Sequence, residues 1–154
     1  MNSSYDNSLI EYADELAINY KLISDISYCV ENINTYFPFV GERINFRLLN
    51  NTKFVDSDQE HISFDAVNFI KSLLDKRICR SDDVVIYIGD SLTNNGYEFY
   101  LNDLLKIIPF LVSKIPQHHY VLFKDFKKII YISFENEIRF GVISVPLKWD
   151  ELNN

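Results

Sequence analysis

Glycine and cysteine are scarce in this chain. Of its 154 residues, 4 are glycine and 2 are cysteine. Loops that cradle phosphate groups need closely spaced glycines, and the nearest pair here, Gly89 and Gly96, is seven residues apart. The two cysteines, Cys29 and Cys79, form no CxxC motif and are too few for a disulfide framework. We therefore expect no phosphate-binding loop of this kind, and we expect reduced, buried thiols.

Long apolar runs are missing as well. The longer ones, such as Val84–Ile88 and Ile107–Val112, fall far short of the roughly 18 residues that a membrane-spanning helix needs. The opening residues, Met1–Glu11, include no basic residue and no apolar segment of a secretory signal. These absences predict a cytoplasmic protein that does not associate with membranes.

Negative charge is what the chain has in excess. It carries 22 acidic and 15 basic residues, which gives a net charge of −7. Nucleic-acid affinity comes largely from lysine and arginine side chains that displace counterions from phosphates, so direct binding to nucleic acid is not expected. Residues 1–42, with seven acids and one base, and residues 81–117, with five acids and two bases, hold the excess. Such a concentration of negative charge either serves solubility or steers a basic partner toward the protein, and the sequence does not decide between these two roles.

Apolar residues at helical spacing predict four helical stretches. They cover residues 9–23, 26–37, 63–77 and 97–115. The first two form two helices or one bent helix. The third begins at a cap formed by Ser63, and Pro109 kinks or divides the fourth.

Runs of β-branched and aromatic residues predict five strands. They cover residues 43–49, 84–88, 119–124, 128–135 and 138–145. The run Val84–Ile88 is apolar throughout, which is typical of a central strand covered on both faces. Asn50 and Asn51 indicate a turn after the first strand. The last three strands are closely spaced and predict an antiparallel meander.

The order of these elements predicts an α+β or mixed α/β fold. Its N-terminal helices and two further helices pack on a sheet of about four to six strands, which ends in the C-terminal antiparallel meander. The length suits a single globular domain over residues 1–154.

A buried strand followed by a serine is the sharpest local motif. Val84–Thr93, with the sequence VVIYIGDSLT and Gly96 after it, resembles the first block of the GDSL esterases and lipases. The resemblance implies that Ser91 is a nucleophile and that the Gly89 region lies near the oxyanion. A serine nucleophile needs a base within hydrogen-bond reach. The family supplies it from a DxxH motif after the serine, whereas Asp58–His61 precedes it here. A small serine esterase that uses Ser91 is one alternative function, and a simple turn is the other interpretation.

Metal-binding patterns are incomplete. The acids at positions 56–60 resemble half of an EF-hand loop, but its sixth position is His61 instead of glycine and its twelfth is Val67 instead of glutamate. His118 and His119 are adjacent, so on a strand they point to opposite faces. We therefore expect neither a metal site nor a cofactor.

Tyrosines in an acidic setting provide a candidate interface. Tyr97, Phe99 and Tyr100 follow a polar loop, and tyrosine is enriched at interfaces because its ring contributes area and its hydroxyl a hydrogen bond. Core packing is the open alternative for these rings. The candidate partner-binding residues are Asp82, Asp83, Asp90, Tyr97, Glu98, Tyr100 and Asp103.

As a whole, the chain resembles bacterial toxin-immunity proteins of the contact-dependent growth inhibition type. The resemblance lies in its size, its acidity, its 10 tyrosines and 12 phenylalanines, and its lack of catalytic machinery. It implies a single-domain inhibitor that binds a cognate toxin, often a basic nuclease, and masks the active site or substrate-binding surface of that toxin. A non-catalytic domain that pairs with itself through its meander is a further alternative.

Overall fold

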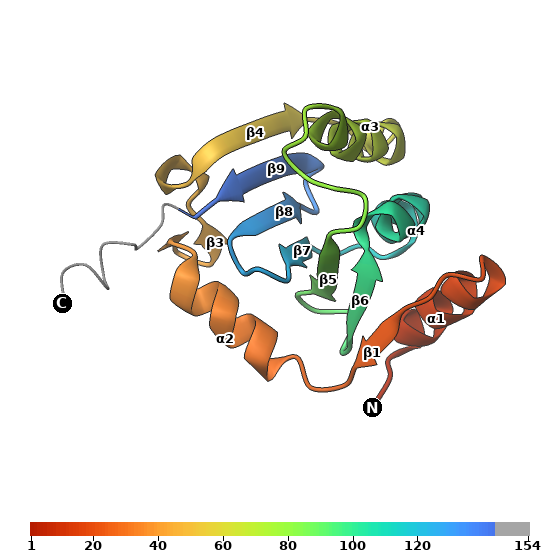
Figure 1. Cartoon of the computed structure of the whole chain (residues 1–154). Helices are drawn as coiled ribbons and strands as arrows, with labels where there is room; N and C mark the ends of the chain where they lie inside the picture. The colour runs from red at the N-terminus through yellow and green to blue at the C-terminus, as the bar shows by residue number, and fades with distance from the viewer. Residues whose placement is uncertain (144–154) are drawn as a thin grey trace.

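A seven-stranded antiparallel sheet forms the middle layer of the chain in the computed structural model, which describes residues 1–143 (Figure 1). In spatial order, its strands are β1 (Lys21–Ile23), β6 (Gly96–Tyr100), β5 (Val84–Gly89), β7 (His119–Phe123), β8 (Lys128–Ile132), β9 (Glu137–Val142) and β4 (Asn50–Asp56). A separate hairpin pairs β2 (Phe39–Val40) with β3 (Arg43–Ile44).

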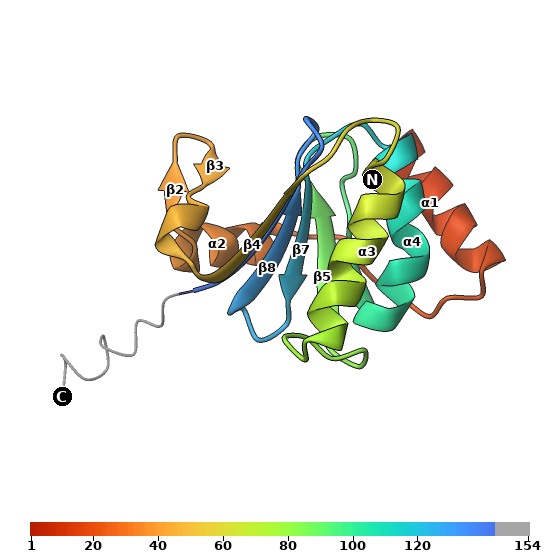
Figure 2. The same cartoon turned by 90° about the horizontal axis from the view of Figure 1, so that it is seen from above.

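Further elements cover both faces of this sheet. One face carries the helices α1 (Ser4–Glu15), α3 (Ile62–Asp75) and α4 (Leu101–Lys114), as Figure 2 shows. The other face carries α2 (Ser27–Tyr36), the β2–β3 hairpin and the short 3-10 turn η1 (Phe46–Leu48). This three-layer arrangement confirms the predicted α+β class, although the sheet is larger than the four to six strands expected.

The side chains of β5 alternate between the two layers. Val85 and Tyr87 pack against the side of α1, α3 and α4, whereas Ile86 and Ile88 pack on the side of α2. All four are buried. Because β5 lies between β6 and β7, the prediction of a central strand covered on both faces is confirmed.

The predicted C-terminal meander is also confirmed. β7 pairs with β8 and β8 with β9, so that Tyr120, Tyr131 and Arg139 stand opposite one another on neighbouring strands. Val145, at the end of the last predicted strand, lies outside the described residues.

The predicted helix over residues 9–23 is too long. α1 ends at Glu15, and a C-terminal cap follows in which Ala17 adopts a φ of 54° and the Ile18 N–H donates to the Ala13 carbonyl. The chain then extends into β1, which pairs with β6 at the edge of the sheet. Local spacing cannot reveal this strand, because its partner is more than seventy residues away in the sequence.

The predicted strand over residues 43–49 is wrong beyond its first two residues. Only β3 is extended there, and η1 follows it. The predicted turn at Asn50 and Asn51 is wrong as well, because β4 begins at Asn50. Asn51, with a φ of 52°, lies at an irregularity in the pairing of β4 with β9, as at a β-bulge.

The predicted helical stretch over residues 97–115 begins with a strand. β6 takes up its first part, and α4 follows and runs on through Pro109 without being divided. Within α4, the Ser113 hydroxyl donates to the Pro109 carbonyl at 2.6 Å. For the preceding helix, α3, the N-cap position belongs to His61 and not to Ser63.

Two phenylalanines provide a matched test of this packing. Phe140 is fully buried in β9, whereas Phe64 on α3 is 69% exposed. We expect Phe140→Ala to lower the free energy of unfolding by about 3–5 kcal/mol and Phe64→Ala by less than about 0.5 kcal/mol, as measured by urea denaturation. Equal effects would contradict the placement of β9 in the core.

Candidate functional site

One buried side chain, that of Gln117, forms hydrogen bonds with the backbone of the loop between β5 and β6. The Oε1 of Gln117 accepts hydrogen bonds from the N–H groups of Ser91, Leu92 and Thr93 at 3.1, 2.6 and 3.4 Å. Its Nε2 donates to the Tyr87 hydroxyl at 3.0 Å and to the Thr93 hydroxyl at 2.9 Å. Because three donors face one end of the amide, its orientation is determined.

Glycine is required where this amide passes the backbone. A Cβ atom on Gly89 would lie 1.8 Å from the Nε2 of Gln117. Beyond the amide, the Tyr87 hydroxyl and the Nδ1 of His119 form a hydrogen bond of 2.7 Å. Burial lowers the pKa of His119 to about 3, so the imidazole is neutral at physiological pH. Gly89 and His119 therefore belong to a packed network around the loop.

Asp6 holds the other side of the same loop. This carboxylate is fully buried, and its Oδ2 accepts the Asn94 N–H at 2.8 Å. Its Oδ1 accepts the Tyr97 hydroxyl at 2.6 Å and the Asn95 N–H at 3.3 Å. It also accepts the Ser3 N–H, which completes a capping box at the start of α1. The loop thus ties α1 to the sheet.

The balance of burial and hydrogen bonding sets the charge of Asp6. Burial raises the pKa of this carboxyl, but the hydrogen bonds from Tyr97, Asn94 and Ser3 outweigh it, so the pKa lies below its ordinary value of 3.8. The carboxylate is therefore ionised at neutral pH.

The hydroxyl of Ser91 lies near Asp90 and not near a base. Its Oγ is 3.4 Å from the Asp90 carboxylate. Within residues 1–143, no histidine forms a hydrogen bond with it, and His61 bonds its own neighbour Asp58 at 2.8 Å. Among the described residues, Ser91 therefore has no base in hydrogen-bond contact, and the esterase alternative stays a prediction. Gly89, Ser91 and Thr93 of the VVIYIGDSLT motif take part in the packing around Gln117.

Metal-ligating groups are also dispersed. The Nδ1 of His118 accepts the Phe134 N–H at 2.9 Å and lies 3.1 Å from the Tyr131 hydroxyl, on the sheet face opposite to His119. Among the residues that the structure describes, no three His, Cys, Asp or Glu side chains are grouped for a metal ion. Cys29 and Cys79 are buried as predicted, and burial raises the pKa of the Cys79 thiol to about 12.

A groove opens between α2, the β2–β3 hairpin and the adjacent face of the sheet. We name it the α2 groove, and its volume is about 290 Å³. Its lining comprises Ile26, Val30, Ile33, Asn34, Phe39, Glu42, Ile88, Gly89, Asp90 and Tyr120.

The α2 groove combines an apolar floor with two carboxylates. Ile33 and Ile88 are buried beneath it. Within residues 1–143, neither Glu42 nor Asp90 forms a salt bridge. Asp90 accepts the His118 N–H at 3.0 Å, which orients its carboxylate. The pKa of Tyr120 is raised, first by burial and then by the charge of Asp90, so its hydroxyl stays protonated.

On the other side of the hairpin, by contrast, the charges are paired. Arg43 reaches Glu135 at 3.1 Å and Glu137 at 3.7 Å, and Arg139 reaches Glu137 at 3.0 Å. Arg43, Glu137 and Arg139 line a hollow of about 360 Å³, and the pairs connect the hairpin to β9 and its preceding turn. Their arrangement suits a structural role in placing the hairpin.

The structure separates the predicted partner-binding residues. Asp82, Asp83, Tyr100 and Asp103 lie at the end of the sheet where β5 begins and β6 ends, whereas Asp90 lies at the opposite end of β5. Asp82 pairs with Arg80 at 3.3 Å, and Asp103 pairs with Lys106 at 3.7 Å. Nearby basic residues, Arg80 and Lys106, thus offset much of the negative charge that residues 81–117 contribute at this end of the sheet.

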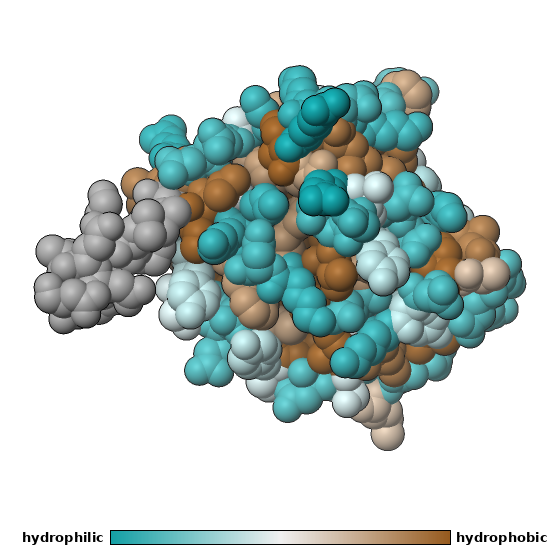
Figure 3. Space-filling view, in the orientation of Figure 1, coloured by the Kyte–Doolittle hydropathy of each residue, from teal (hydrophilic) through white to brown (hydrophobic). Residues whose placement is uncertain are grey.

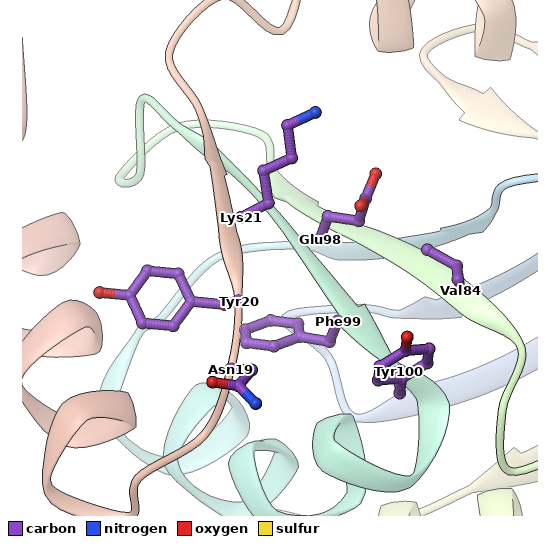
Figure 4. A pocket seen from close by; sticks show the side chains of 7 residues that line it. All are labelled: Asn19, Tyr20, Lys21, Val84, Glu98, Phe99 and Tyr100. Carbon is purple, nitrogen blue, oxygen red and sulfur yellow. The ribbon is translucent and has the colours of Figure 1, made fainter.

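Tyr97 and Glu98 differ in their surroundings. Tyr97 is only 1% exposed and bonds Asp6, so its ring is core and is not available to a partner. Glu98 pairs with Lys124 at 2.9 Å. A hollow of about 200 Å³ lies beside Glu98 and Tyr100 at the β1–β6 edge, where the Lys21 and Glu98 side chains extend to the same side (Figure 4).

Comparison of the chain with protein-family models, with curated proteins and with solved structures finds no match. None of the helices in residues 1–143 has the length and hydrophobicity needed to cross a bilayer. The assignment of function therefore depends on the geometry. Sequence reasoning missed Phe39 and Gln117, which belong to no motif, whereas Ser3 and Asp6 do show the spacing of a capping box.

The role of Gln117 leads to a stability test with an internal control. Gln117→Leu leaves three loop N–H groups without their acceptor, and we expect it to lower the free energy of unfolding by about 2–4 kcal/mol. The exposed Gln59→Leu should change it by less than about 0.5 kcal/mol. Urea denaturation of both variants measures this difference, and similar values would refute the supporting role of Gln117.

The depressed pKa of Asp6 leads to a test against pH. Because the pKa is lower in the folded than in the unfolded chain, the carboxylate contributes stability above about pH 4 that is lost as the pH falls through the folded-state value. Asp6→Asn should therefore lower stability at pH 7 and flatten its decline in acid, whereas the exposed Glu11→Gln should leave both unchanged. Denaturation midpoints between pH 2 and pH 7 measure this, and an unchanged decline in Asp6→Asn would contradict it.

Proposed function

We propose that this protein is an inhibitor of the immunity type, which binds a basic toxin protein and masks its active site or substrate-binding surface. The α2 groove carries the proposal, because it joins exposed apolar surface to two carboxylates that form no salt bridge within residues 1–143. A polar rim around a small apolar centre is typical of protein interfaces that form between separately folded proteins.

The distribution of ion pairs supports the α2 side of the molecule as the contact face. Among the described residues, no salt bridge neutralises the exposed acids of the first acidic segment. These acids are Glu11, Asp14, Glu15, Asp25, Glu31 and Glu42. In the second segment, Asp82, Glu98 and Asp103 each have a basic partner. Glu11, Asp14 and Glu15 belong to α1, across the sheet, so a cationic surface that approaches the α2 face would meet the negative charge of Asp25, Glu31 and Glu42.

Exposed apolar side chains accompany these acids. Val30 and Phe39 line the α2 groove while remaining more than one third exposed, and Val40 beside them is 64% exposed. In the space-filling view, hydrophobic patches alternate with hydrophilic residues, so the surface offers small apolar contacts within a polar setting (Figure 3). Such a mosaic suits a protein that is stable alone and binds a partner reversibly.

The proposed mechanism is occlusion, with no bond made or broken in the partner. Complementary charge raises the rate of encounter with a basic protein, and apolar contact in the groove slows dissociation. A nuclease holds the phosphates of its substrate with lysine and arginine side chains. Carboxylates such as those of Glu31 and Glu42 would form ion pairs with those lysine and arginine side chains and so exclude the nucleic acid.

Charge reversal on α2 and the hairpin tests the contact face. The measurement is the affinity for the basic protein encoded beside this chain, determined by calorimetry at low salt. We expect Glu31→Lys combined with Glu42→Lys to weaken the complex by at least about 30-fold, because like charges then oppose each other at the interface. Added salt should weaken the wild-type complex as well.

A matched control distinguishes this face from the other end of the sheet. Asp82→Lys combined with Asp103→Lys changes the net charge equally and should alter the affinity by less than about threefold. The reverse ranking would assign the interface to the second acidic segment, and absence of any complex would contradict the proposal. Sedimentation of the chain alone examines the alternative of self-association.

A further inference from the structure

The α2 groove has the size of a site for one side chain. Its volume of about 290 Å³ lies at the lower limit of the roughly 300–1,000 Å³ that small-molecule pockets occupy. Aliphatic side chains from two layers form its walls: Ile26 and Val30 come from the α2 side, and Ile88 comes from β5. Such walls favour an apolar stem and not a fully hydrated group.

The polar groups of the groove favour a cation. Glu42 comes from the turn of the β2–β3 hairpin and Asp90 from the end of β5, so carboxylates enter from two separate elements. The rings of Phe39 and Tyr120 also line the groove, and the faces of aromatic rings attract cations. Within residues 1–143, no lysine or arginine lines the groove.

We propose that the α2 groove receives a single arginine side chain of the partner, an assignment that rests on the proposed function for the identity of that partner. The methylene stem lies between the aliphatic walls, and the guanidinium lies between the two carboxylates and the aromatic rings. Arginine fits better than lysine because its planar guanidinium stacks on rings and presents several N–H donors to two carboxylates at once.

The polar network beneath the loop positions one of these carboxylates. The Oε1 of Gln117 accepts a hydrogen bond from the N–H group of Ser91, the residue after Asp90. The Asp90 carboxylate itself accepts one from the His118 N–H. The Asp90 side chain is therefore oriented before any partner arrives, which lowers the entropic cost of binding.

The test uses Nα-acetyl-arginine methylamide as the probe and the full chain as the receptor, observed through backbone amide chemical shifts. We expect saturable shifts at Ile33, Ile88, Gly89 and Asp90. The citrulline analogue has nearly the same shape without the charge, and the lysine analogue has the charge without the plane. Each should bind at least tenfold more weakly than the arginine probe.

Two amide variants connect binding to the carboxylates. Glu42→Gln with Asp90→Asn should weaken binding of the arginine probe by at least tenfold, while Asn at position 90 retains an acceptor for the His118 N–H. Asp82→Asn with Asp103→Asn changes the net charge equally and should leave binding unaltered. Equal binding of citrulline or lysine, shifts confined to other elements, or no effect of the first pair would overturn the inference.

Failure of this inference is distinguishable from failure of the proposed function. A tight complex with the neighbouring basic protein, together with no binding of the arginine probe to the groove, contradicts the inference alone. Binding of the probe to the groove without any protein complex supports the groove assignment and contradicts the proposed function.

Discussion

The carboxamide of Gln117 fills the space against Gly89, and the shape of the β5–β6 loop depends on it. Three loop N–H groups converge on its oxygen, and its nitrogen continues the network to Tyr87 and the neutral His119. From the other side, the buried carboxylate of Asp6 binds Asn94 and joins the loop to α1. Buried polar groups are costly unless they are fully hydrogen-bonded, so this network specifies one arrangement of the loop. That arrangement places Asp90 at the rim of the α2 groove.

The spatial distribution of charge differs from its distribution along the chain. Counting acids by segment identifies two negative regions, but folding pairs the second one with nearby bases such as Arg80, Lys106 and Lys124. The first region stays unpaired across the described residues of α1, α2 and the hairpin. Three of its acids, Asp25, Glu31 and Glu42, lie at α2 and the hairpin beside the apolar α2 groove, whereas the acids of α1 belong to the helix layer across the sheet. Attraction at a distance and contact at short range are therefore both available on the α2 face.

The part of this structure that could be predicted from the sequence is the part that patterns within single segments determine. The buried run Val84–Ile88, the meander and α2 follow from apolar periodicity, which each segment carries by itself. β1 could not be found in this way, because it pairs with β6, more than seventy residues further along the chain. β6 pairs with the preceding strand β5, but its five residues run directly into α4 and were included in the predicted helical stretch. The same limit applies to the site. Asp90 was among the predicted partner-binding residues, but Phe39 and Glu42 join it only through the packing of the hairpin on the sheet, and Tyr97 is removed from the surface by its bond to Asp6.

Hydrogen exchange of the chain with and without the basic protein that the proposed function requires tests the central claim most directly, since it reports on every backbone amide without altering the chain. The account predicts new protection in α2, in the β2–β3 hairpin and at the end of β5, with no change where β5 begins and α4 starts. Protection at Asp82, Asp83 and the first turn of α4, with α2 unchanged, would contradict it.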